Sequence, residues 1–419
     1  MSSQRGTSFV FILFFFFTPL NTHPADVSFD LPTAIQYALR ENPELKAKRH
    51  SLGIAQGRAQ QAGLLFQNNP RFSVEVESQV SRRPGTTLEF NLLQELEIAG
   101  QRGYRYEAAE KNLAQAQLSI EDAERLVRWE VMRAFYNLLA LQQTIAGLKE
   151  VLAAQDTLVE AGQKRFDRED ISILELNTLR LDRDQVQNEL ANKTRERLFT
   201  EKQLRLLLGF QDDGPLMASG NLMDLLLPKT RDAIPDKQTF QACVLANRPD
   251  LKAAKLSTAV RDAELRLAQA RRIPNISLGP RYKRDNVVNE HLVGGEISIP
   301  LPFFNRNQEE IATALANQSV SKVELEGRLL TAKQEIDAAY AKLALAQERI
   351  DAYGKTYLGE LEKMLALTRK AYESGEMTIF EFSITRDRFT QARLRSLDAA
   401  LAYLQAMAEL EAQAPRCLR

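Results

Sequence analysis

Apolar residues recur every seven positions along two long stretches of the chain, one in each half. A strict seven-residue repeat keeps one seam of a helix against a neighbour and imposes a left-handed supercoil. The first stretch has two such seams, so its helix can pack against one neighbouring helix on each side, as helices do in the wall of a helical barrel. A simple antiparallel coiled coil is the alternative. The seams are Leu113, Ile120, Val127, Ala134, Leu141 and Leu148; Val131, Leu138, Ile145, Leu152 and Val159; and Leu329, Ile336, Leu343, Ile350, Tyr357, Met364 and Ala371.

This spacing predicts one long helix in each half, over residues 103–168 and 307–373. At 1.5 Å per residue each long helix measures about 100 Å, whereas the flanking helices measure about 55 Å. Two short helices placed end to end therefore match one long helix, and each half forms two parallel columns. The short helices are expected over 32–67, 171–208, 238–272 and 378–412.

Four shorter segments place an apolar residue at every second position, as Phe72, Val74 and Val76 do, which is typical of strands. Each has roughly the length that crosses a bilayer as a tilted strand. Four strands cannot close a barrel alone, and open sheet edges are not tolerated in lipid. The segments are therefore either hairpins of a soluble domain or part of a barrel that several copies complete. The strands are expected over 70–78, 87–96, 275–283 and 291–300.

The two halves repeat the same order of motifs: helix, two strands, long helix, turn and helix. The segment "ALRENPELKA" at 38–47 matches "VLANRPDLKA" at 244–253, and two further pairs of segments match in the same order at nearly the same offset. We therefore predict a duplication. The expected organisation is a signal over 1–25, a first repeat over 26–208, a linker over 209–237, a second repeat over 238–412 and a tail over 413–419.

A second conspicuous repeat is "FDREDISILEL" at 166–176, which matches "YESGEMTIFEF" at 372–382. Each segment interrupts a helical pattern, so we expect a U-turn between the long helix and the short helix that follows it. Asp170 or Ser172 in the first turn and Thr378 in the second can cap the returning helix. Gly375 permits a tight reversal of the chain.

Composition excludes several classes of function. Lysine plus arginine equals aspartate plus glutamate, 55 each, so no basic field attracts nucleic acid. No nucleotide-binding, hydrolase or metalloprotease motif is present, so we expect no enzyme activity, no cofactor and no bound metal. Cys243 and Cys417 could form one disulfide in an exported chain, but Cys417 is in a tail that looks frayed, so we expect no structural disulfide.

The N-terminus has the pattern of a secretory signal. Arg5 precedes the apolar run Phe9–Leu20, which is too short to span a bilayer as a helix. Cleavage is expected after Ala25, and a buried helix is the alternative.

Taken together, these segments resemble the TolC-like outer-membrane efflux family. The resemblance lies in "AIQYALRENPEL" at 34–45, "QELEIAGQR" at 94–102, "IPLPFFNRNQ" at 299–308 and the turn at 372–382, and it covers essentially the whole mature chain. "QELEIAGQR" looks most like the branch that serves heavy-metal pumps of the resistance-nodulation-division class. A type I protein secretion duct and a soluble periplasmic coiled-coil scaffold are the alternatives.

The resemblance implies a mainly α-helical fold with a small β part. Three chains would close a twelve-stranded barrel in the lipid of the outer membrane of a Gram-negative bacterium, and their helices would form a hollow cylinder through the periplasm. A periplasmic adaptor protein and an inner-membrane pump would dock at the turns and open the closed end. Substrate would pass passively from the pump to the exterior.

The resemblance also implies candidate gate residues. In the family, acidic residues near the start of the returning helix face the channel axis at its narrowest point. Glu381 matches one such position, Glu175 is its counterpart in the first half, and Ile384 replaces the second acidic residue. The alternative is that Glu175 and Glu381 only stabilise helix N-termini. The residues expected to contact the adaptor are Arg168, Asp170, Ser172, Gly375, Met377 and Thr378.

Overall fold

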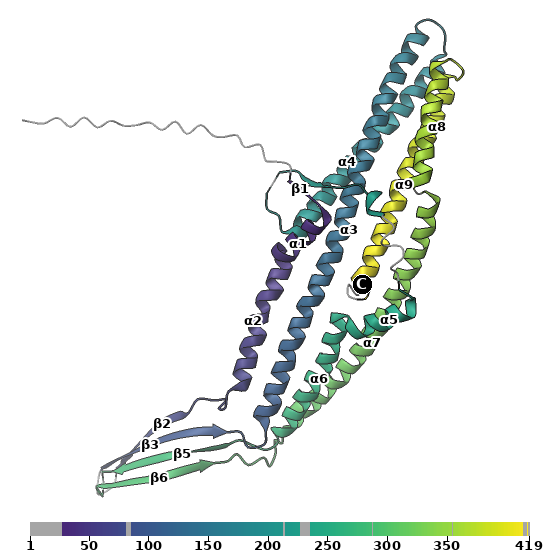
Figure 1. Cartoon of the computed structure of the whole chain (residues 1–419). Helices are drawn as coiled ribbons and strands as arrows, with labels where there is room; N and C mark the ends of the chain where they lie inside the picture. Colours follow the sequence, from purple (N-terminus) through teal and green to yellow (C-terminus); the bar gives the residue numbers. More distant parts are fainter. Residues whose placement is uncertain are drawn as a thin grey trace, which may run out of the picture.

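The computed structural model describes residues 27–80, 85–212, 214–226, 235–286, 288–353, 355–413 and 417. The chain forms an elongated helical bundle with a sheet at one end and the two helix turns at the other (Figure 1). None of the helices in these ranges has a stretch long and apolar enough to cross a membrane. The signal expected over 1–25 lies outside the described residues.

In the first half, α3 (Gln101–Phe166) is the long helix, and α2 (Pro43–Gly63) and α4 (Ile173–Leu208) lie along its two ends (Figure 1). The single helix expected over 32–67 is wrong, because α1 (Leu31–Glu41) ends before Pro43. Proline lacks an N–H group and keeps the residue before it out of the helical region, so Asn42 has φ −54° and ψ 124°.

The second half repeats this break. Pro249 divides the helix expected over 238–272 into α5 (Lys237–Asn247) and α6 (Pro249–Ala270). In the first half the Asn42 amide donates to the Leu207 carbonyl at 2.8 Å, and in the second the Arg248 guanidinium donates to Gln413 Oε1 at 2.7 Å. Each bond spans 165 residues, so both halves tie the same break to the end of their returning helix.

The expected continuous helix over 307–373 is also wrong. It consists of α7 (Gln308–Ala352) and α8 (Lys355–Glu373), followed by the returning helix α9 (Ile379–Gln413). Tyr353 has φ −118° and ψ 22°, which is not helical. Its carbonyl accepts a 2.8 Å hydrogen bond from the Ser396 hydroxyl, and Ser396 is fully buried. A tertiary contact thus holds the backbone at this break.

The four expected strands form one antiparallel sheet in the order β2-β3-β5-β6. Its strands are β2 (Arg71–Gln79), β3 (Gly85–Leu96), β5 (Ile276–Asp285) and β6 (Glu290–Ser298). The hairpins of the two halves join where β3 pairs with β5. The backbones approach closely there, since a Cβ on Gly279 would lie 1.7 Å from the Leu92 carbonyl oxygen.

The expected linker over 209–237 contains structure that the sequence patterns did not predict. Within it, β4 (Leu216–Ala218) pairs in parallel with β1 (Val27–Phe29), and a short 3-10 helix, η1, covers Asp224–Leu226. Leu216 and Phe29 belong to the main hydrophobic core, which lies at mid-length, where α1, α3, α4 and α9 meet. The described part of this segment therefore packs into the bundle.

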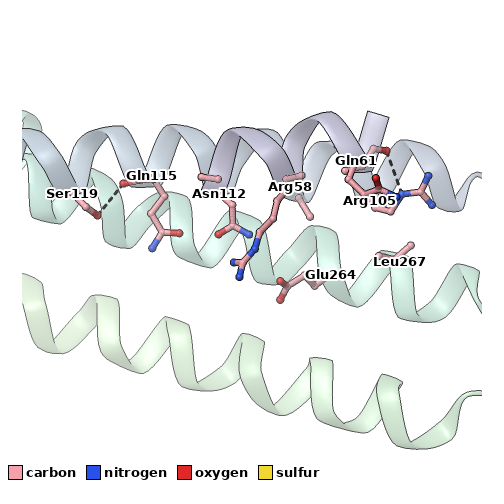
Figure 2. A pocket seen from close by; sticks show the side chains of 13 residues that line it. Arg58, Gln61, Arg105, Asn112, Gln115, Ser119, Glu264 and Leu267 are labelled. Carbon is pink, nitrogen blue, oxygen red and sulfur yellow. Dashed lines mark hydrogen bonds between the residues drawn. The ribbon is translucent and has the colours of Figure 1, made fainter. Parts of the chain in front are cut away.

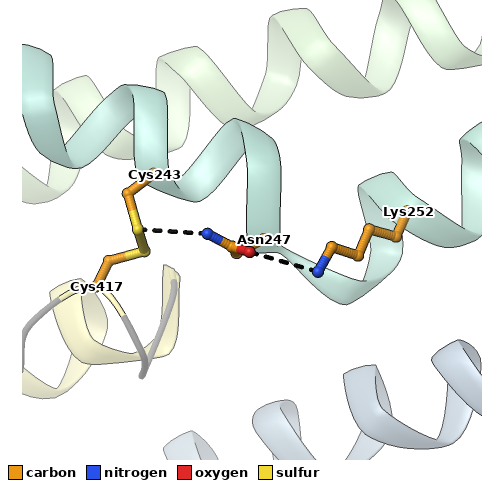
Figure 3. Close-up of a disulfide and its surroundings, with 4 residues drawn as sticks. All are labelled: Cys243, Asn247, Lys252 and Cys417. Carbon is orange, nitrogen blue, oxygen red and sulfur yellow. Dashed lines mark hydrogen bonds between the residues drawn. A yellow bond between two sulfur atoms is a disulfide. The ribbon is translucent and has the colours of Figure 1, made fainter.

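The expectation that Cys243 and Cys417 stay unpaired is wrong, because they form a disulfide with a Cα–Cα distance of 6.0 Å (Figure 3). The end of α9 returns beside α5, and Cys417 packs against a second core of α5, α7 and α9 residues. The bond joins positions 174 residues apart. It ties the C-terminal end of the chain to the start of the second half.

Candidate functional site

The first helix turn ends α3 with a Schellman motif. The Asp170 N–H donates to the Arg165 carbonyl at 2.9 Å, and the Glu169 N–H donates to the Phe166 carbonyl at 2.9 Å. This pattern needs a left-handed residue at the helix end, and Glu169 takes that conformation with φ 61°.

The second turn repeats the motif. The Glu376 N–H donates to the Ala371 carbonyl at 2.9 Å, and the Gly375 N–H donates to the Tyr372 carbonyl at 3.1 Å. Gly375 is the left-handed residue, with φ 78°. The sequence predicted that Gly375 permits the reversal of the chain. In the first turn Glu169 occupies the same position and the chain reverses in the same way.

A capping box starts each returning helix. In the first turn the Glu175 N–H donates to Ser172 Oγ at 3.2 Å, and Glu175 Oε2 accepts from the Ser172 N–H at 2.8 Å. Ser172 is therefore the cap, and Asp170 is not. Glu381 and Thr378 form the same box at 3.2 and 2.9 Å. These bonds stabilise the ionised carboxylates and hold the pKa of both Glu175 and Glu381 below the ordinary value.

The two turns belong to one tip of the molecule because their helices pack together. Leu158 of α3 and Leu179 of α4 form a small buried cluster, and Tyr372 and Phe382 of the second turn pack against it. The Tyr372 and Phe382 rings stack at 4.9 Å. A Cβ on Gly162 would lie 2.7 Å from Leu179 Cδ1, so a larger residue there would require the Leu179 side chain to shift.

The predicted gate residues lie on exposed surface of this tip. Glu381 and Ile384 are three residues apart and face the same side of α9. No hydrogen bond or ion pair among the described residues joins Glu381 to Glu175. Of the residues expected to contact the adaptor, Met377 is half-buried and the others are exposed: Arg168, Asp170, Ser172, Gly375 and Thr378.

Sequence reasoning missed Arg386, which lies on the opposite side of α9 from Ile384. Its side chain is buried, and its guanidinium nitrogens have no hydrogen-bond partner within the described structure. Burial lowers its pKa and raises that of the nearby Asp182 carboxyl. Arg386 lines a cavity of about 520 Å³ between α3, α8 and α9. No sequence signal separates it from the other arginines of α9.

The sheet has one apolar face and one polar face. Side chains alternate along each strand, and directly paired residues share a face. The register therefore places ten large side chains on one face, which also carries Arg284 and His291 near the β5–β6 loop: Phe72, Val74, Val76, Leu88, Phe90, Leu92, Leu278, Tyr282, Val293 and Ile297. The other face is mainly polar: it carries Ser73, Glu75, Glu77, Glu89, Asn91, Arg281, Lys283 and Glu296, with Leu93 and Leu292 as apolar exceptions.

Contacts on the two faces match this division. The Phe90 ring lies 6.4 Å from the Phe72 ring and 6.0 Å from the Tyr282 ring, so aromatic residues of three strands meet on the apolar face. On the polar face, Arg281 and Glu89 form a cross-strand ion pair at 2.6 Å. The apolar side chains are largely exposed, with Phe72 at 63% and Val293 at 84%.

Arginines fix the junction between the helices and the sheet. Arg102 and Arg105 of α3 donate to the Gly63 and Ala62 carbonyls at the end of α2, at 3.0 and 3.2 Å. Cations at a helix C-terminus satisfy carbonyls that have no partner within the helix. Figure 2 shows the adjoining groove of about 530 Å³ between α2, α3 and α6, with Arg58 and Glu264 on its two sides.

Among the described residues, no group of three or more His, Cys, Asp or Glu side chains could hold a metal ion. The features that can serve a function are instead surfaces: a sheet with a mainly apolar face, a long helical body and two capped turns. These features describe a conduit or a scaffold, and known proteins distinguish the two.

The model of the family "Outer membrane efflux protein" matches residues 34–210 and 243–414, which make up most of the chain. The cobalt-zinc-cadmium resistance protein CzcC of Cupriavidus metallidurans is 23% identical over 400 residues, covering 94% of this chain and 90% of CzcC. The cation efflux system protein CusC of Escherichia coli is 24% identical over 288 residues, covering 65% and 61%.

Solved structures share the fold. A crystal structure of CusC aligns with a TM-score of 0.74 at 20% identity and covers 91% of each chain. The CmeC outer membrane channel of Campylobacter jejuni aligns with a TM-score of 0.74 at 16% identity, covering 91% of this chain and 85% of CmeC. The chain therefore belongs to the TolC-like outer membrane efflux protein family, the exit ducts of tripartite efflux systems, which lie in the outer membrane and extend into the periplasm.

Proposed function

We propose that this chain is one subunit of a homotrimeric outer-membrane duct. The observation that carries the proposal is the four-stranded sheet with one apolar face. Among the described strands, β2 and β6 have a neighbour on one side only. Exposed strand edges are not tolerated in lipid, so neighbouring copies must pair with them. Three copies supply twelve strands, an even number within the range of outer-membrane barrels.

In this barrel the apolar face meets lipid and the polar face lines the lumen. The exposed side chains of Phe72 and Val74 then lie in the hydrocarbon region, where apolar side chains are favoured. The opposite assignment would place Glu75 and the Glu89–Arg281 pair in lipid, where charged groups are costly.

We further propose metal cations as the cargo, delivered by a pump of the resistance-nodulation-division class through a periplasmic adaptor that docks at the two turns. The names of CzcC and CusC, which match the sequence, support this class of cargo. The acidic residues Glu75, Glu77, Glu89 and Glu296 on the polar face also favour cations.

Expression in a bacterium that lacks its own metal-efflux duct but keeps the matching adaptor and pump tests the cargo. Restored tolerance to zinc, cobalt or cadmium is the expected result. Tolerance restored only to organic drugs would reject metal cargo. A detergent extract that runs as a monomer both before and after boiling, with no crosslinked trimer, would reject the assembly.

Glu381 and Ile384 are our candidates for the closed end of this duct. Both hydrogen bonds from Thr378 reach Oε2 of Glu381, so within the described structure Oε1 remains available to a cation. Three copies would form a ring of carboxylates, with a ring of Ile384 side chains one helical turn further along α9. A carboxylate ring attracts cations, and an apolar constriction excludes water.

Planar-bilayer recordings of Glu381→Gln separate this role from helix capping, because glutamine keeps the capping oxygen and loses the charge. Weaker cation preference is the expected result, and Ile384→Ser should raise resting conductance. Thr378→Ala is the matched control, because it removes the capping hydroxyl and keeps the charge of Glu381. If Glu381→Gln and Ile384→Ser both leave conductance and selectivity unchanged in an intact trimer, the gate lies elsewhere.

A further inference from the structure

A stripe of exposed residues runs along α9 from the candidate gate. Its members follow one another at intervals of three and four residues, and every one is exposed. The residues between them are largely buried against the other helices, as Ser383, Arg386 and Ala392 are. The stripe consists of Glu381, Ile384, Arg388, Gln391, Arg395 and Asp398.

This spacing keeps the stripe on one side of α9. Alternating steps of three and four residues average to 3.5, which follows a left-handed supercoil without drifting around it. Whatever direction Glu381 and Ile384 face, Arg388 and Arg395 therefore face it too. At 1.5 Å per residue they lie about 10 Å and about 21 Å along the helix from Glu381.

Neither arginine of the stripe is neutralised within the described structure. Arg388 and Arg395 are exposed and make no ion pair or hydrogen bond to another described side chain. Arg393, two residues before Arg395, is also exposed but differs in its direction and in having a partner. It lies about 200° around the helix from Arg395 at 3.6 residues per turn, and its guanidinium pairs with Glu150 of α3 at 3.0 Å.

The first half carries the opposite charge at the same positions. Counting from the equivalent capping glutamates, Asp182 of α4 takes the place of Arg388, and Glu189 takes the place of Arg395. The second half thus has basic residues where its duplicate has acids. Asp182 is half-buried and accepts a 3.4 Å hydrogen bond from the Ser383 hydroxyl of α9, whereas Arg388 is exposed, so the two halves use this position differently.

We infer that Arg388 and Arg395 form two basic rings inside the duct, just beyond the candidate gate, and that they determine its ion selectivity. This inference rests on the proposed trimer with the Glu381 stripe facing its axis. Three arginines in each ring attract anions and repel free cations, and confinement in a low-dielectric wall strengthens the effect. Cations that pass the Glu381 ring then cross a segment rich in anions, so metal ions traverse it together with counter-ions.

Reversal-potential measurements on the full-length trimer in planar bilayers under a KCl gradient test the inference. Replacing both Arg388 and Arg395 with glutamine should raise the K⁺/Cl⁻ permeability ratio by about twofold or more. The effect should be large in about 0.01 M salt, where the Debye length is about 30 Å, and small in about 1 M salt, where it is about 3 Å. Arg393→Gln is the matched control, since it removes one arginine from the other side of α9.

The outcomes separate this inference from the proposed function. If Glu381→Gln alters selectivity while the Arg388 and Arg395 double variant behaves as the wild type, the duct stands and the basic rings are rejected. If Arg393→Gln has the same effect as the double variant, net charge rather than position is responsible, and the inference also fails. If the assembled protein forms no ion-conducting pore, the proposed duct itself is wrong.

Discussion

Glu169 and Gly375 occupy the same position in the two helix turns, and both are left-handed, with φ angles of 61° and 78°. Each ends a long helical column with the same pair of backbone hydrogen bonds. A side chain disfavours this conformation, whereas glycine adopts it without a steric penalty. The two turns therefore share one backbone geometry at different energetic cost.

We expect Glu169→Gly to stabilise the first turn by about 1 kcal/mol and Gly375→Ala to destabilise the second by about the same amount. Urea unfolding followed by far-UV circular dichroism measures both changes. Gly359→Ala, within α8, is the control, because a helical alanine should stabilise rather than destabilise. Equal effects of the two alanine substitutions would contradict the assignment of strain to the left-handed position.

The capping boxes predict a pH dependence. The pKa of Glu175 and of Glu381 is lowered from 4.5 by hydrogen bonds to the capping residue. A lowered folded-state pKa means that these carboxylates stabilise the fold above the unfolded pKa and lose that contribution as the pH falls through the folded value.

Urea midpoints should therefore decrease as the pH falls below 4.5, and they should decrease less in a Glu175→Gln, Glu381→Gln double variant. At neutral pH, Ser172→Ala should cost about 1 kcal/mol through loss of the cap. A double variant that follows the same pH curve as the wild type would show that other carboxyl groups govern the acid sensitivity.

The turns show how much of the tip is encoded locally. Ser172 with Glu175 and Thr378 with Glu381 have the spacing of a capping box, and the sequence predicted both turns from such short-range signals. The alternation around Val74 likewise predicted both hairpins. Asn42-Pro43 and Arg248-Pro249 also carried a local signal against the single helices expected over 32–67 and 238–272, since proline restricts the residue before it.

Other features depend on contacts between distant residues. The break at Tyr353 involves Ser396 of another helix, and the disulfide joins residues 174 positions apart. Gly354 follows Tyr353 in the sequence, yet Gly147 and Gly162 lie within the continuous helix α3, so a glycine alone does not predict an interruption. The burial of Arg386 and the charge reversal between α4 and α9 emerge only once the helix faces are known.

The disulfide should stabilise the C-terminal end of the bundle. A disulfide typically contributes about 2–4 kcal/mol, so Cys417→Ser and reduction with dithiothreitol should each lower the thermal midpoint. Cys243→Ser should have the same effect. The double variant should be no less stable than either single variant, since all three remove one bond. Additive losses would mean that the two sulfurs act separately.

The junction of the two hairpins should tolerate no side chain at Gly279. A Cβ there would lie 1.7 Å from the Leu92 carbonyl oxygen, so Gly279→Ala must separate β3 from β5. We expect this variant to lose the trimer in a semi-native gel. Gly294→Ala is the matched control, because a Cβ at Gly294 of β6 meets no atom within 4 Å. Loss of assembly in both variants would show that glycine content, rather than the close approach, matters.

The two faces of β2 make opposite predictions for neighbouring residues. Val74 is paired with Phe90 on the apolar face, and Ser73 is paired with Asn91 on the polar face. If the apolar face meets lipid, Val74→Arg should cost about 2–4 kcal/mol near mid-depth, whereas Ser73→Arg should cost far less because its side chain reaches water in the lumen. Reversible unfolding from phospholipid vesicles measures both values. Equal tolerance of the two arginines would reject burial of this sheet in lipid. A larger penalty at Ser73 would reverse the faces and place the acidic side chains outside, which the cost of charge in hydrocarbon makes the less stable arrangement.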